Sequence, residues 1–175
     1  MLMQLIHSIF FYFIIYSFFG WIIEGLFNLL TRGTFLKPNF LMLPLKPMYG
    51  IAATLLIYLK ALLPIGLFLI SALILPTLVE YLTAELLFRC YTLKYWDYSH
   101  CSHQYKGYIC LRFSIYWFVL CIVLAYGLQP YIALFYNAIS WFWHPFFPVA
   151  VFIFLLDLLL TLYHRYMAKQ PRSAH

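Results

Sequence analysis

The sequence predicts an all-α fold: an integral membrane helical bundle with about five transmembrane helices and one interfacial or re-entrant helix. Apolar residues make up 66% of the 175 residues, and charged residues make up 9%, against about 25% in ordinary globular domains. Mean hydropathy is +0.89. Lipid must therefore solvate much of the surface, and we expect a single multi-spanning domain over residues 1–175. Four of the five acidic residues lie inside the apolar stretches: Glu24, Glu80, Glu85 and Asp157.

The apolar stretches predict the spans in chain order. A transmembrane helix needs about 20 apolar residues. The sequence predicts spans over about 5–30, 48–63, 65–88, 107–127 and 147–166, of which the second is short. The first lacks the basic start of a signal peptide and is too long for one, so we expect it to remain as a span. The stretch 129–144 is too short to cross and is followed by Pro145 and Pro148, which predicts the interfacial or re-entrant helix.

The basic residues predict the orientation. They gather in the connections 32–47 and 89–106 and in the C-terminal tail, whereas the turn between the second and third spans has only Lys60 and the segment 128–145 has none. Five spans place all three basic groups on one side, which is the cytoplasmic side. We therefore expect the N-terminus outside and the C-terminus inside. The net charge of +6 reflects these connections, so no nucleic acid is expected as a partner. The basic residues are Arg32, Lys37, Lys46, Arg89, Lys94, Lys106, Arg165, Lys169 and Arg172.

The charged residues inside the spans are predicted to reach a similar depth. Glu24, Glu80 and Asp157 lie eight or nine residues before a basic helix end, roughly 12 Å at 1.5 Å per residue. Arg112 follows Lys106 by six residues, roughly 9 Å. A carboxylate at a helix centre costs at least about 2.5 kcal/mol, so such groups are usually internal and paired. We expect Glu24, Glu80 and Arg112 to form one network, with Asp157 at its edge or within it.

Helical spacing supports a shared interior for these residues. Polar and small residues recur at intervals of three or four along the first, third and fifth spans, which places them on one face of each helix. Glu85 differs, because it precedes Arg89 by four and is expected to form a surface ion pair. The aligned residues are Ser17, Gly20, Glu24, Asn28 and Thr31; Thr77, Glu80 and Ala84; and Asp157, Thr161 and His164.

Three roles for this cluster stay open. It could lock the bundle together, bind or pass an ion or polar solute, or carry acid–base catalysis by a buried carboxylate. The candidate pathway residues are Glu24, Asn28, Glu80, Arg112 and Asp157. No nucleophile motif and no phosphate-binding P-loop is present, so no enzyme and no cofactor is expected.

The polar connection 89–106 contains a second candidate feature. Trp96, Asp97, Tyr98 and Ser99 predict an ordered segment at the membrane surface, in which the aspartate accepts bonds from nearby backbone N–H groups as in an Asx turn. It serves either as an anchor or as a docking or gating surface. The residues 100–103 include two histidines and a cysteine, but no metal-ligand spacing is present and no metal is expected. The four cysteines predict free thiols.

Several short strings occur together in a characteristic order. They are Phe10-Phe11, Tyr16-Ser17, Gly20-Trp21, Glu24, Arg32-Gly33, Phe35-Leu36, Pro47-Met48-Tyr49-Gly50, Glu80-Tyr81, Glu85, Trp96-Asp97-Tyr98-Ser99, Gly107-Tyr108-Ile109, Leu111, Ser114 and Trp117. Over about residues 10–120, this order resembles the bacterial membrane family of ABC-transporter type IV, or CmpB-like, permeases. The connection 37–47 and Phe118 depart from the family, which more often has a shorter glycine-proline turn and a glycine at these places.

The resemblance implies a multi-pass protein of the bacterial cytoplasmic membrane with a role in transport. Such a permease would work with a separate ATPase subunit, because this chain carries no nucleotide-binding motif. Two alternatives stay open: a non-transporting accessory subunit that holds another membrane protein, and an intramembrane enzyme. The partners expected are the lipid bilayer and one other membrane or ATPase subunit.

Overall fold

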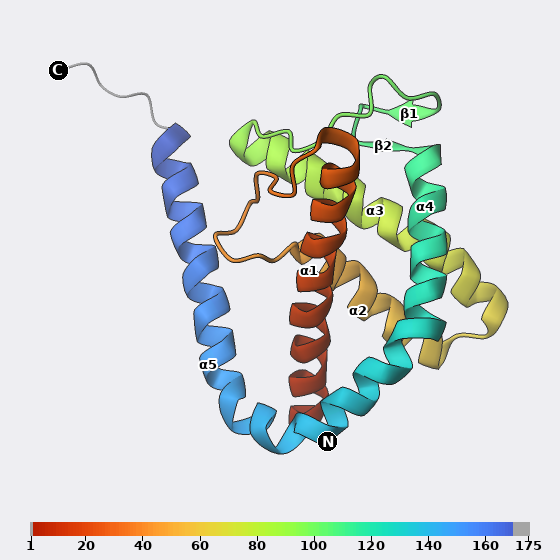
Figure 1. Cartoon of the computed structure of the whole chain (residues 1–175), viewed down its shortest axis with the longest axis vertical. Coiled ribbons are helices and arrows are strands. Elements are labelled where there is room, and N and C mark those ends of the chain that lie inside the picture. The colour runs from red at the N-terminus through yellow and green to blue at the C-terminus, as the bar shows by residue number, and fades with distance from the viewer. Residues whose placement is uncertain (1, 170–175) are drawn as a thin grey trace.

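A computed structural model of the chain describes residues 2–169 and confirms the all-α prediction. A hairpin of two short antiparallel strands precedes α4, and a π-helical segment, Val123–Leu128, joins α4 to α5. Helices suit lipid because every backbone polar group within a helix is satisfied by the helix itself. The elements in Figure 1 are α1 (Leu2–Arg32), α2 (Pro47–Leu62), α3 (Ile65–Tyr91), β1 (Gln104–Tyr105), β2 (Ile109–Cys110), α4 (Leu111–Ile122) and α5 (Gln129–Lys169).

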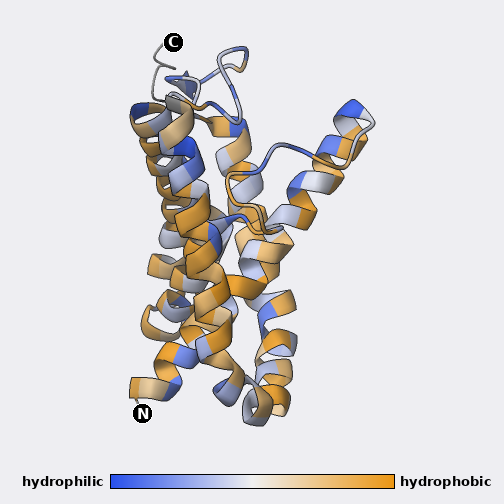
Figure 2. Cartoon of the chain, turned by 90° about the vertical axis from the view of Figure 1, so that its left-hand side faces the viewer, coloured by the Kyte–Doolittle hydropathy of each residue, from blue (hydrophilic) through white to orange (hydrophobic). Residues whose placement is uncertain are grey.

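The outer surface of the helices is apolar. Three helical segments in the described residues are long and apolar enough to cross a membrane: Leu2–Arg32, Ile65–Tyr91 and Leu111–Ala168. Figure 2 shows their middle parts mostly orange and the connections mostly pale or blue. Many large apolar side chains face outward, among them Leu30 and Leu62, which are 85% and 78% exposed. Such a surface is stable in lipid and not in water, so this is a membrane protein.

The ends of α1 and α3, the hairpin and the described end of α5 lie at one end of the molecule, opposite the first residues of α1 (Figure 1). Arg32, Arg89 and Lys106 therefore lie at that end. Arg172 lies outside the described residues. We call this end the basic end.

The connection 33–46 does not stay at the basic end but folds back along α1. The backbone N–H of Lys46 donates to the carbonyl of Ser17 at 2.9 Å. Ser17 precedes Arg32 by fifteen residues, which is roughly 22 Å along a helix. As a result α2 begins beside the middle of α1, and its 16 residues span roughly 24 Å, less than the ~30 Å of a hydrocarbon core.

Two glycines allow α1 and α2 to pack closely. A Cβ on Gly50 would lie 2.2 Å from Ser17 Oγ and 2.5 Å from the carbonyl oxygen of Phe13, and one on Gly20 would lie 2.4 Å from the Tyr49 ring. Small residues at helix crossings are typical of membrane bundles, where association depends on close packing. This contact fixes the start of α2, and with it the end of the connection, against α1.

The segment 129–144 is not a separate helix, which corrects the sequence prediction. It is the first part of α5, which continues through Pro145 and Pro148 to Lys169. Proline removes one helical hydrogen bond and bends a helix, but neighbouring bonds carry the helix past it. Figure 1 shows the result: the chain passes beneath the start of α1, bends, and rises beside the bundle as the second arm of α5. Trp143 is buried there and donates its indole N–H to the carbonyl of His7 at 3.0 Å.

Candidate functional site

A cavity of about 440 Å³ lies between α1, α2, α3, α4 and the segment before the hairpin. Ligand sites in proteins typically measure about 300–1,000 Å³, so its size suits a small molecule. It is lined both by polar residues of the predicted spans and by residues of the segment 96–99, although these lie far apart in the chain. These residues are Glu24, Asn28, Glu80, Trp96, Asp97 and Tyr98.

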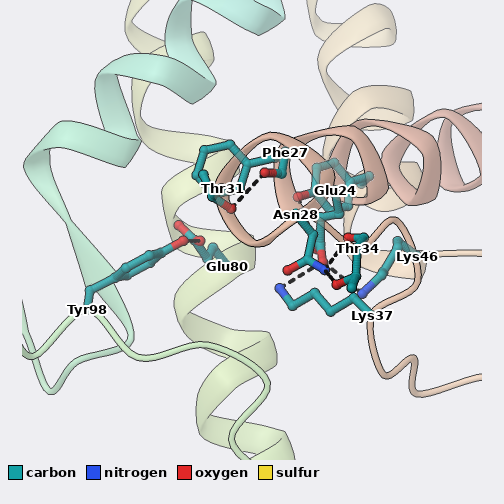
Figure 3. A network of polar contacts seen from close by, with 10 residues as sticks. Glu24, Phe27, Asn28, Thr31, Thr34, Lys37, Lys46, Glu80 and Tyr98 are labelled. Carbon is teal, nitrogen blue, oxygen red and sulfur yellow. Dashed lines mark hydrogen bonds and ion pairs between the residues drawn. The ribbon is translucent and has the colours of Figure 1, made fainter.

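On the α1 side, Glu24 is paired with two lysines. Its Oε2 atom lies 2.9 Å from Nζ of Lys46 and 3.1 Å from Nζ of Lys37, and its Oε1 accepts a bond of 3.2 Å from the Tyr49 hydroxyl. Figure 3 shows both lysines reaching Glu24 from the connection below α1. Glu24 and Lys46 side chains are only 13% and 11% exposed. The carboxylate is therefore neutralised inside the bundle.

The fold of the connection supplies these lysines. Lys46 directly precedes Pro47, the first residue of α2, so the docking of α2 against Ser17 carries its ammonium group to Glu24. Asn28, one turn after Glu24, donates its amide to the carbonyl and the hydroxyl of Thr34 at 2.6 and 3.1 Å, which holds the start of the same connection.

On the α3 side, the donors that bond to Glu80 in the described part of the chain are neutral. The Tyr98 hydroxyl donates to its Oε1 at 3.0 Å and the Trp117 indole N–H to its Oε2 at 2.9 Å. The residue is 2% exposed, and within the described residues no lysine, arginine or histidine forms an ion pair with it. Its position on α3 toward the interior agrees with the polar face predicted from the sequence.

Aromatic rings surround Glu80. The Tyr98 ring stacks on Phe113 with centroids 4.5 Å apart, and the Tyr49 ring meets Trp117 edge-on at 5.3 Å. All four rings line the cavity. Burial and the Glu80 carboxylate both raise the pKa of Tyr98, so its hydroxyl stays protonated and available as a donor.

The segment 96–99 is ordered by its own hydrogen bonds. Asp97 Oδ1 accepts from the backbone N–H of Ser99 at 2.9 Å and from its hydroxyl, which confirms the predicted Asx turn. Bonds to Lys94 and Ser99 hold the pKa of Asp97 well below its usual range. The Trp96 indole N–H donates to the carbonyl of Tyr108 at 2.8 Å. These bonds fix Tyr98 over the cavity.

Arg112 does not join the network, so that part of the prediction is wrong. Its Nε donates to the Tyr116 hydroxyl at 2.9 Å, four residues further along α4, and it forms no ion pair with a carboxylate of the described residues. The depth argument assumed a helix from Lys106 onward, but α4 begins only at Leu111, so Arg112 lies in its first turn, where it is exposed. Glu85 pairs with Arg89 at 2.5 Å, as its spacing predicted.

Asp157 lies away from the cavity and caps the connection instead. It is buried, and its Oδ1 and Oδ2 atoms accept the backbone N–H groups of Met42 and Leu43, both at 3.0 Å. The bonds satisfy two amides of a non-helical segment that packs inside the bundle, which lipid could not do. Asp157 thus acts on the Glu24 side indirectly, by holding the loop that carries Lys37 and Lys46.

Sequence reasoning missed four residues of the site: Lys37, Lys46, Tyr49 and Trp117. The lysines were assigned to the membrane surface because their connection was expected to stay there. One signal pointed inward: Lys46 is followed at once by Pro47 and a short apolar stretch, which is the pattern of a helix that begins within the bundle. No group of three or more His, Cys, Asp and Glu in the described part of the chain is arranged to hold a metal ion.

Comparison with known proteins identifies a family and supplies no further relative. The sequence model of the family described as "Putative ABC-transporter type IV" matches residues 11–162, which confirms the resemblance predicted from the sequence. No curated protein and no solved structure matches the chain.

Proposed function

Because the chain belongs to this transporter-related family of membrane proteins, we propose that it is the membrane subunit of a bacterial transporter whose cavity between Glu24 and Glu80 binds a polar solute. A separate ATPase subunit would supply the energy, since the sequence carries no P-loop. Transport is preferred to a purely structural role and to catalysis on one observation. Both buried carboxylates line a cavity large enough for a solute, whereas residues that only lock helices together would meet in closed packing.

The non-helical connection supports this proposal. In membrane proteins, irregular backbone at depth is found where it is buried in protein or lines a water-filled cavity, and broken helices often form transporter sites. Here the connection 33–46 passes along α1 and supplies Lys37 to the cavity wall. The start of α2 follows directly, and its Tyr49 side chain lines the same cavity.

The proposed orientation has five crossings with the basic end in the cytoplasm, so the cavity would open toward that side. Two leucines of nearly equal exposure test it: Leu36 in the connection, 77% exposed, and Leu62 before the turn between α2 and α3, 78% exposed. In a cysteine-free background on intact cells, a membrane-impermeant maleimide should label Leu62→Cys and should label Leu36→Cys only after permeabilisation. The reverse labelling pattern would show that the protein has the opposite orientation in the membrane.

The binding proposal is tested by filling the cavity. Leu120 lines it, and the adjacent Val119 is 54% exposed on the outer surface of α4. A panel of cationic, neutral and anionic solutes is screened for stabilisation of the purified protein in nanodiscs, since a ligand of the native state raises the melting temperature. At least one solute should stabilise wild type and the control Val119→Trp but not Leu120→Trp. The proposal fails if no solute shows this dependence on Leu120.

A further inference from the structure

The two acidic residues of the cavity differ in what neutralises them. Glu24 has two lysines, Lys37 at 3.1 Å and Lys46 at 2.9 Å, so this wall carries one positive charge in excess. Among the described residues, Glu80 accepts hydrogen bonds from Tyr98 and Trp117, and both donors are neutral. An ionised carboxylate that is buried with no cation is costly, and a bound cation would remove that cost.

The surroundings of Glu80 are suited to one kind of cation. Rings of Tyr49, Tyr98, Phe113 and Trp117 line the cavity with it, and aromatic faces attract ammonium groups, most strongly those that are alkylated and weakly hydrated. A metal ion would need further oxygen or nitrogen ligands, and no group of three His, Cys, Asp or Glu among the described residues is arranged to hold one.

We propose that the cavity binds a small organic ammonium ion, with its charged group at the Glu80 carboxylate and its alkyl groups against the aromatic rings. This inference rests on the proposed function and names the class of its solute. The excess positive charge at Lys37 and Lys46 sets the orientation, because it repels the ammonium group from the Glu24 wall. Figure 3 shows Tyr98 reaching Glu80 from one side and both lysines beneath α1 on the other.

Three solutes of nearly the same shape test the charge requirement on wild-type protein in nanodiscs. Choline is cationic, 3,3-dimethylbutan-1-ol is its neutral isostere, and 3,3-dimethylbutanoate is anionic. Binding is followed by calorimetry. Choline should bind at least about tenfold more tightly than the other two, which corresponds to about 1.4 kcal/mol. Equal or tighter binding of the neutral or anionic isostere overturns the inference.

Two glutamates on α3 test the position of the charge. Glu80→Gln removes the charge but keeps one oxygen, which can accept from the Trp117 indole N–H, and its amide NH2 can donate to the Tyr98 hydroxyl. It should weaken choline binding by about tenfold or more. Glu85→Gln is the matched control, because Glu85 pairs with Arg89 and Lys106 at the surface. Its choline affinity should equal that of wild type. Unchanged affinity in a folded Glu80→Gln protein overturns the inference.

The failures of the two proposals are distinguishable. If a neutral or anionic solute stabilises the protein in a way that Leu120→Trp abolishes, and choline does not, the ammonium inference is overturned and the solute cavity stands. If no solute of any charge shows the dependence on Leu120, the solute cavity itself is overturned, and the ammonium inference with it.

Discussion

The two walls of the cavity place a carboxylate in the membrane by different means. At Glu24, a loop folds back into the bundle and brings two lysines with it, so the charge is matched by ion pairs. At Glu80, helix α4 and the segment before the hairpin supply an indole and a phenol, so the carboxylate receives hydrogen bonds but forms no ion pair with a described residue. At the first wall the protein itself neutralises the carboxylate, whereas at the second wall only a cation or a proton would do so.

If the cavity binds an ammonium ion as proposed, this difference makes Glu80 the acid that meets its charge. Both residues are buried acids on transmembrane helices at a similar distance from a basic helix end, and their sequence contexts gave no reason to treat them differently. A charge that its own protein neutralises contributes mainly to holding the loop in place. A charge left without a counter-ion beside a cavity is available to a ligand. The first three predictions below each perturb one wall and leave the other intact, and the fourth perturbs neither.

The largest effect is expected at the Glu24 wall. Lys46→Met removes the closer of the two lysines and leaves a buried carboxylate with one cation, so the free energy of unfolding should fall by about 3 kcal/mol, the low end for a broken buried pair. Adding Glu24→Gln should restore part of the loss. Lys94→Met, which removes the lysine of the exposed pair with Asp97, is the control and should have far less effect. Unfolding by SDS in mixed micelles measures all four proteins.

A double mutant no more stable than Lys46→Met alone would show that Glu24 does not depend on this lysine. The two walls would then not differ in the way proposed.

The next largest effect is expected at the contact between α1 and α2, which holds the Glu24 wall but not the Glu80 wall. Gly50→Ala would place a Cβ 2.2 Å from Ser17 Oγ and 2.5 Å from backbone of α1, so α2 must shift, at a cost of about 2–3 kcal/mol. Gly66→Ala, where no atom lies within 4 Å, should be neutral. Hydrogen exchange of Gly50→Ala should speed up at the amide of Lys46, which docks on Ser17, and stay unchanged at Tyr98, whose amide bonds to Gly107. Equal acceleration at both amides would mean that the walls unfold together.

The elements with the strongest physical constraint were predictable from the sequence. The starts and ends of α1, α2 and α3 follow from apolar stretches bounded by charged residues and proline, and the inward faces of Ser17, Asn28, Glu80 and Asp157 follow from helical spacing. The Asx turn at Asp97 was predictable because it is a local interaction. In each case the deciding residues lie within one or two turns of each other.

The parts of the fold and the site that could not be predicted depend on contacts between segments distant in sequence. A non-helical connection has no periodicity, so nothing local showed that residues 33–46 fold back to Ser17 or that Asp157 would cap them. Proline was equally ambiguous: Pro145 and Pro148 bend α5 where the sequence was taken to end a helix. Depth along a helix can be computed from residue number, but the direction in which a side chain points depends on its neighbours.

A smaller effect is expected at the Glu80 wall. Tyr98→Phe keeps the ring on Phe113 and removes one hydrogen bond to the carboxylate, so the free energy of unfolding should fall by about 1 kcal/mol, as is typical of hydrogen bonds within membrane bundles. Tyr105→Phe, at a phenol that is 56% exposed, is the control and should be neutral. If choline binds at Glu80, it should raise the melting temperature of the wild-type protein by more than it raises that of the Tyr98→Phe protein. If Tyr98→Phe lowers the free energy of unfolding as much as Lys46→Met does, the two walls do not differ in the way proposed.

The smallest effect is expected for Arg112, and it tests the geometry that the sequence suggested most strongly. Were Arg112 the partner of the buried acids, Arg112→Leu would strand a charge, and Glu24→Gln or Glu80→Gln would restore stability. The structure instead directs its guanidinium to the Tyr116 hydroxyl on the exposed side of α4. The single change should therefore be nearly neutral, and each double mutant should lose the sum of its single losses, because the sites share no partner. Thermal unfolding of the single and double mutants in nanodiscs measures this. Restored stability in either double mutant would return Arg112 to the network and make both walls parts of one ion-pair cluster.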